Sequence, residues 1–105
     1  MILSTTDQIE GMRIAEVKGL VQGNTIRARH LGRDIMAGLR NIVGGEVTEY
    51  TRLMTESRAQ ATQRMAEEAE SRGANAVVGV RFVTSMVMAG ASELLAYGTA
   101  VVVEE

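Results

Sequence analysis

The last third of the chain is apolar on both faces of a predicted β-hairpin, and no other pattern constrains the fold as strongly. Residues 76–88 are rich in β-branched side chains, which favours a strand over a helix. We expect a turn at Ala89-Gly90-Ala91 and a returning strand over residues 93–103. One predicted face of the first strand carries Ala76, Val78, Val80, Phe82, Met86 and Met88, and the other carries Val77, Gly79, Arg81, Val83, Ser85 and Val87.

The returning strand repeats this two-sided pattern. An antiparallel sheet that shows one face to water normally carries polar residues on that face, so the second apolar face needs a cover. Leaving several Val- or Leu-sized side chains wet would forgo about 1.5 to 3 kcal/mol each. We therefore expect a homo-oligomer. The alternative is a monomer. Its second face would then be a flat ligand-binding sheet, or a lone helix would lie across both faces.

Two strands are predicted near the start of the chain, before the first helix. Alternation over residues 13–21 indicates a strand, with turns at Gly11 before it and Gly23-Asn24 after it. A short edge strand is expected within residues 2–5. These strands join the hairpin in one sheet.

Two helices are predicted between the strands. An apolar stripe at helical spacing runs through residues 27–43, and Gly44-Gly45 ends it. A second amphipathic helix spans 46–72, with a C-cap at Arg72-Gly73. The order is β-α-α-β-β, which predicts a single α+β domain over residues 1–105, with an antiparallel sheet packed on two helices.

Composition excludes several classes of function. The net charge of −2, a single Lys and three aromatic rings are against nucleic-acid binding. No apolar run reaches the roughly 18 residues of a membrane span, and no secretory signal is visible, so we expect a cytoplasmic protein with no membrane partner. The absence of Cys removes disulfides, thiolate metal sites and cysteine nucleophiles.

Metal ligands are few. His30 and Asp34 are four residues apart and would share one face of the first helix, which gives two ligands from one subunit. The simpler interpretation is a solvent-facing His beside a carboxylate. The methionines could form a thioether set, but at helical and strand spacing they are more typical of core. The methionines considered are Met12, Met36, Met54, Met65, Met86 and Met88.

Three arginines of the first predicted helix form a candidate anion site. Arg29, Arg33 and Arg40 fall close together around the helix, beside its apolar stripe. Repeated around a ring, they would make a positive annulus for a small anionic ligand. The simpler interpretation is pairing with Asp34 or with acidic residues of a neighbouring subunit, and we favour it.

Catalysis finds little support. No Ser lies in nucleophile-elbow spacing, and His30 is the sole imidazole base. We therefore assign no catalytic residue and no cofactor, although an active site at subunit junctions near Arg33, Asp34 and Tyr97 stays open as an alternative.

Several spaced blocks resemble the YbjQ-like family of small prokaryotic proteins. The blocks are 38–46, Tyr50, 73–80, Ser4-Thr5-Thr6, Arg33-Asp34 and 98–101. The resemblance implies a strongly curved antiparallel sheet like that of the dodecin subunit, and a homopentameric ring. It also implies an unsolved function under a heavy-metal-binding label. The leading interpretation is a non-enzymatic homo-oligomer that binds a small ligand or ion or acts as a scaffold. A metal-binding protein is the alternative.

Overall fold

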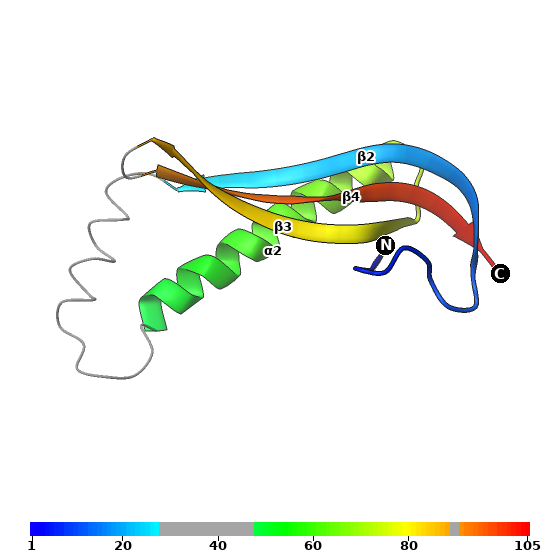
Figure 1. Cartoon of the computed structure of the whole chain (residues 1–105), viewed down its shortest axis with the longest axis horizontal. Coiled ribbons are helices and arrows are strands. Elements are labelled where there is room, and N and C mark those ends of the chain that lie inside the picture. Colours follow the sequence, from blue (N-terminus) through cyan, green and yellow to red (C-terminus); the bar gives the residue numbers. More distant parts are fainter. Residues whose placement is uncertain (28–47, 89–90) are drawn as a thin grey trace.

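A computed structural model describes residues 1–27, 48–88 and 91–105. One helix lies along one face of a four-stranded sheet (Figure 1). The strands follow the spatial order β1-β3-β4-β2, so β2 and β1 are the outermost. The elements are β1 (Ile2–Leu3), β2 (Arg13–Arg27), α2 (Thr48–Ser71), β3 (Ala76–Met88) and β4 (Ala91–Glu104).

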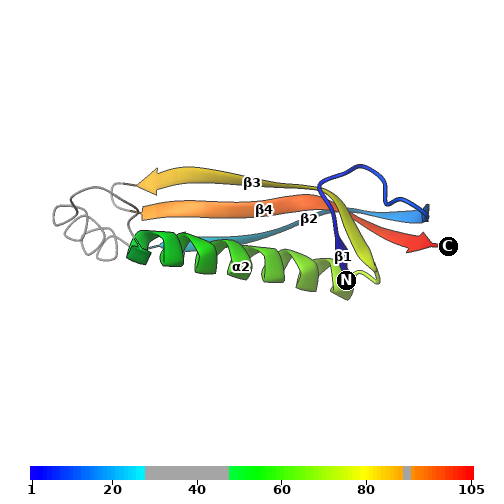
Figure 2. The ribbon, with the colours of Figure 1, turned by 90° about the horizontal axis from the view of Figure 1, so that it is seen from below.

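The sheet is mixed rather than purely antiparallel. β4 pairs antiparallel with both β2 and β3, which confirms the predicted long hairpin. β1 pairs parallel to β3, with Ile2 opposite Ala76 and Leu3 opposite Val77. The predicted edge strand near the N-terminus is therefore present. Its direction follows from the loop that carries the chain from β1 back to the start of β2 (Figure 2).

β2 is longer than predicted, and the expected turn at Gly23-Asn24 is wrong. The strand continues to Arg27, a residue that the sequence assigned to the first helix. Gly23 serves another purpose, because a Cβ there would lie 2.3 Å from the carbonyl oxygen of Ala61 and 2.4 Å from the nitrogen of Met65. The glycine therefore lets α2 approach the sheet closely. The rest of the predicted first helix lies outside the described residues.

Gly79 interrupts the alternation of β3. It has φ of +64°, a conformation that favours glycine, and the pairing with β4 shifts register between Val78 and Arg81. As a result Val77 and Val80 enter the same core cluster, although strict alternation had placed them on opposite faces. The predicted face assignment of β3 is wrong beyond Gly79 for this reason.

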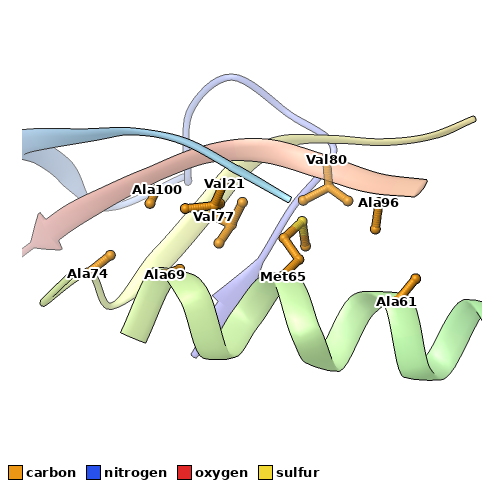
Figure 3. Close-up of a cluster of buried hydrophobic side chains, with 9 residues drawn as sticks. All are labelled: Val21, Ala61, Met65, Ala69, Ala74, Val77, Val80, Ala96 and Ala100. Carbon is orange, nitrogen blue, oxygen red and sulfur yellow. The ribbon is translucent and has the colours of Figure 1, made fainter. Parts of the chain in front are cut away.

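The main core lies between α2 and the sheet. Ala61, Met65 and Ala69 line the buried stripe of the helix, and Met65 points toward Val77 and Val80 (Figure 3). Ser57 is buried on the same side of the helix. The helix ends as expected at Gly73, which has φ of +80° and whose nitrogen donates to the carbonyl oxygen of Glu70 at 3.0 Å.

A smaller core lies on the opposite face of the sheet, which we call the outer face. Ala76, Val78, Val101 and Val103 form it. Ile9, Met12 and Ile14 pack against it from the N-terminal segment and the start of β2. The chain therefore covers part of its own second apolar face, at the end of the sheet where β3 begins. The expectation that another subunit must cover the whole face was too broad.

Candidate functional site

The residues proposed from the sequence as ligands fall outside the described part of the chain. Arg29, His30, Arg33, Asp34 and Arg40 all belong to residues 28–47. The anion and metal interpretations that rest on them remain predictions. Among the residues named for a possible active site at a subunit junction, Tyr97 is the one that the structure describes.

Tyr97 lies on the outer face, in a polar row that crosses three strands. Its neighbours Ala96 and Ala100 face α2, so alternation places Tyr97 on the other side of β4. Its partners across the sheet are Gln22 on β2 and Arg81 on β3. Tyr97 is 36% exposed. The row places a guanidinium and an amide on either side of a phenol.

Arg81 is held in place by main-chain oxygens. Its Nη1 donates to the carbonyl oxygens of Thr5 and Val80, each at 2.8 Å. The N-terminal segment that supplies Thr5 is itself bonded to β3, because the nitrogen of Gly79 donates to the carbonyl oxygen of Thr6 at 2.8 Å. This cation is thus oriented by the fold. Sequence reasoning missed the Arg81–Tyr97–Gln22 row because the shift at Gly79 changes which residues oppose each other.

Beyond this row the outer face carries exposed apolar side chains, with the polar residues Asn24 and Glu93 between them. Val83 opposes Leu95 on β4, and Leu20 opposes Thr99. Leu20 is 62% exposed, Ile26 58% and Val83 43%. The main polar contact there is an amide–carboxylate bond from Asn24 Nδ2 to Glu93 Oε2 at 3.0 Å. We call the set Leu20, Ile26, Val83, Leu95 and Tyr97 the outer apolar patch.

The other face of β3 is also bare along its second half. Phe82 opposes Ala96 and therefore lies on the helix side, yet it is exposed. The cause is the path of α2, which packs mainly on β2 and β4 and meets β3 around Val77 and Val80, in its first half. Figure 2 shows the helix running beneath the other two strands. Residues 81–88 are exposed throughout, and we call them the open half of β3.

The methionines divide between core and surface. Met65 is fully buried, as predicted, and Met12 and Met54 are half-buried. Met86 is 78% exposed and Met88 is also exposed, so the prediction that they belong to the core is wrong within this chain. They lie in the open half of β3, where no described element covers them. Met36 lies outside the described residues.

The described residues assemble neither a metal site nor a membrane span. Over residues 1–27, 48–88 and 91–105, no three side chains of the His, Cys, Asp and Glu types come close enough together to hold a metal ion. Within the same ranges, no helix is long and apolar enough to cross a membrane.

Comparisons with known proteins place the chain in a family. The YbjQ family model, described as "Putative heavy-metal-binding", matches residues 1–104. A UPF0145 protein of Methanosarcina acetivorans is 60% identical over 101 residues, which cover 96% of this chain and 95% of that protein. One from Dehalococcoides mccartyi is 58% identical over 104 residues, covering 99% of this chain and 100% of that protein.

A solved structure shares the fold. It is the crystal structure of a DUF74-family protein of unknown function from Pediococcus pentosaceus, with a TM-score of 0.65. The alignment covers 99% of this chain and 98% of that one at 15% sequence identity. At this identity the likeness concerns the fold alone.

Proposed function

This chain belongs to the YbjQ family, and we propose that it works as a non-enzymatic homo-oligomer that binds a small anionic ligand or an ion, or serves as a scaffold, at its subunit junctions. The observation that carries the proposal is the outer apolar patch together with the open half of β3. Both present large apolar side chains that no described element covers. Monomeric proteins rarely expose large apolar patches to water.

The energetics favour a cover. Burying the exposed part of a side chain such as Leu20 or Ile26 is worth about 1 kcal/mol, because each is more than half exposed and full burial contributes about 1.5 to 3 kcal/mol. Summed over the patch, the gain from burial reaches a few kcal/mol, which offsets part of the free-energy cost of association.

The molecular shape supports the same conclusion. The radius of gyration is 16.9 Å, whereas a compact domain of this length has about 13 Å. The principal extents of 53 × 27 × 16 Å describe a long, thin body. A second subunit packed along the sheet would supply the missing thickness.

A ring of five subunits is the form of assembly that the family resemblance implies, with the dodecin-like sheet curving around the ring. In such a ring Arg29, Arg33 and Arg40 would recur in every subunit, and their summed charge would attract phosphate or carboxylate groups. The Arg81–Tyr97–Gln22 row adds an oriented cation on the outer face. These cations make an anion the ligand class that we favour.

Native mass spectrometry of protein purified without chelator tests the proposal. We expect a pentamer, with extra mass where a ligand is retained. Leu20→Glu should release monomers, because a buried carboxylate would be unpaired. Gln63→Glu is the matched control, since it adds the same charge on the exposed face of α2. A wild-type monomer at micromolar concentration would overturn the proposal.

A metal-binding role is the second candidate, and the family description favours it. We propose that His30 and Asp34 would provide the ligands, completed by the same residues of neighbouring subunits. Metal analysis of the purified wild type and of His30→Ala is the test. A stoichiometric metal that is lost in the variant supports this role, and a metal-free wild type that takes up none on dialysis contradicts it.

A further inference from the structure

The two long edges of the sheet differ in how their main-chain groups are satisfied. On β2, side chains from α2 and from Arg72 directly after it bond the outward main-chain groups of residues 20–24. Arg72 Nη1 donates to the carbonyl oxygen of Leu20 at 2.9 Å, the nitrogen of Gln22 donates to Glu68 Oε2 at 3.0 Å, and Arg64 Nη1 donates to the carbonyl oxygen of Asn24 at 2.5 Å. This stretch of the β2 edge is therefore closed to another strand.

The edge of β3 is closed only in its first part. There the N-terminal segment runs alongside it, with the nitrogen of Ser4 donating to the carbonyl oxygen of Val77 at 2.9 Å and the nitrogen of Val80 donating to that of Ser4 at 3.0 Å. These bonds show that the edge accepts an added strand. From Arg81 to Met88, the described residues supply a pairing strand only on the β4 side.

The open half of β3 lacks the features that protect natural edge strands. Edges are usually guarded by Lys, Pro or other charged residues that discourage pairing with a second chain. This stretch contains no Pro, Gly, Lys or acidic residue, and Arg81 at its start is its one charge. It carries apolar side chains on both faces, with Phe82 on the helix side and Val83 on the outer side. Such a segment favours strand addition.

We propose that the open half of β3 is a strand-pairing edge, and that its occupant is a strand of a second copy of this chain. The inference rests on the proposed self-assembly and specifies how it occurs. The edge is continuous with the outer apolar patch through Val83 and Leu95, so one neighbouring subunit covers both. α2 closes the β2 edge along residues 20–24, so this stretch is not the strand that pairs with β3 of the neighbour. A ring of five needs a heterologous contact, so the pairing strand comes from another part of the neighbouring chain.

Hydrogen–deuterium exchange of the wild-type chain tests this directly. The outward main-chain amides of residues 82–88 should exchange at least about 10-fold more slowly in the assembled protein than in protein diluted until it dissociates. Fast exchange in the assembled state would overturn the inference while leaving self-assembly intact. Equal protection in assembled and dissociated protein would also overturn it, because the cover would then belong to the same chain.

Ser85→Lys adds the missing edge charge without harming the subunit. Ser85 is exposed and opposes Glu93, so the new ammonium gains a cross-strand partner within its own chain. We expect the concentration for half-assembly to rise by about 10-fold or more, with an unchanged thermal midpoint for the dissociated subunit. Gln63→Lys, with the same added charge on α2, should assemble like the wild type. If Ser85→Lys also assembles like the wild type, the edge is not used.

Discussion

The two halves of β3 lie in opposite surroundings. Residues 76–80 are buried apart from half-buried Gly79, whereas residues 81–88 are all exposed, although both stretches are rich in Val and other apolar side chains. The first half has α2 on one face and the N-terminal segment on the other. The second half has neither. Burial along this strand thus depends on what covers it, because apolar side chains such as Phe82, Val83 and Met86 stay exposed where no described element packs on them.

Gly79 marks the boundary between the halves. Its left-handed backbone shifts the register with β4, and its nitrogen donates to the carbonyl oxygen of Thr6 in the N-terminal segment. Just beyond it, Val80 and Arg81 make the last bonds along β3 to the described N-terminal segment, and the strand then diverges from the path of α2 (Figure 1). The strand changes from a core element to a surface that is available for a partner.

A pair of methionines gives the largest expected effect. Met65→Ala should lower the free energy of unfolding of the dissociated subunit by about 2 to 5 kcal/mol, because a fully buried side chain is lost and a cavity remains. Met86→Ala, the same change in the open half of β3, should change it by less than about 0.5 kcal/mol. Urea denaturation at a concentration where the subunit is monomeric measures both.

In the assembled protein, the difference between the effects of Met65→Ala and Met86→Ala should be smaller. There Met86→Ala should weaken association, since its side chain is then covered by the neighbouring subunit. Equal destabilisation of the monomer by both substitutions would show that the open half is already covered within one chain.

The second prediction concerns how closely α2 approaches the sheet. Gly23→Ala would place a Cβ against main-chain atoms of Ala61 and Met65, and rigid helix backbone must move to make room. We expect a loss of about 1 to 3 kcal/mol in thermal or urea unfolding. Gly11→Ala is the control, because no atom lies within 4 Å of its added Cβ and only its φ of +80° opposes the change. A loss of about 1 kcal/mol is expected there.

Sequence periodicity predicted which helices and strands are present better than it predicted where they end. The hairpin, the long helix with its Gly73 cap and the short N-terminal strand follow from periodicity and turn residues, which act over a few residues. The turn predicted at Gly23 is absent, because sequence alone does not distinguish a glycine that lets a helix approach closely from a glycine that makes a turn. The choice depends on the position of α2, which is set by tertiary packing.

The surface patterns were predicted only in outline. Two-sided apolarity correctly indicated that the sheet exposes apolar residues, but it could not show that Ile9, Met12 and Ile14 cover the part nearest the N-terminus. Nor could it reveal the row around Tyr97, because strict alternation does not allow for the extra residue at Gly79. The arginine and histidine candidates of the first predicted helix remain predictions, since residues 28–47 lie outside the described structure.

Hydrogen bonds at the edge of the sheet should contribute less to the free energy of unfolding than apolar burial on its face, and Glu68 provides the test. Glu68→Ala removes the acceptor for the nitrogen of Gln22 and the partner of Arg72 Nη2, which lies 2.7 Å from Glu68 Oε1. We expect a loss of about 0.5 to 1.5 kcal/mol in the urea unfolding of the monomer, because water can replace the carboxylate at this exposed position. Glu67→Ala, one residue earlier on the exposed face, should cost less. A loss from Glu68→Ala as large as that from Met65→Ala would mean that edge bonding, and not face burial, separates the covered part of the sheet from the open half of β3.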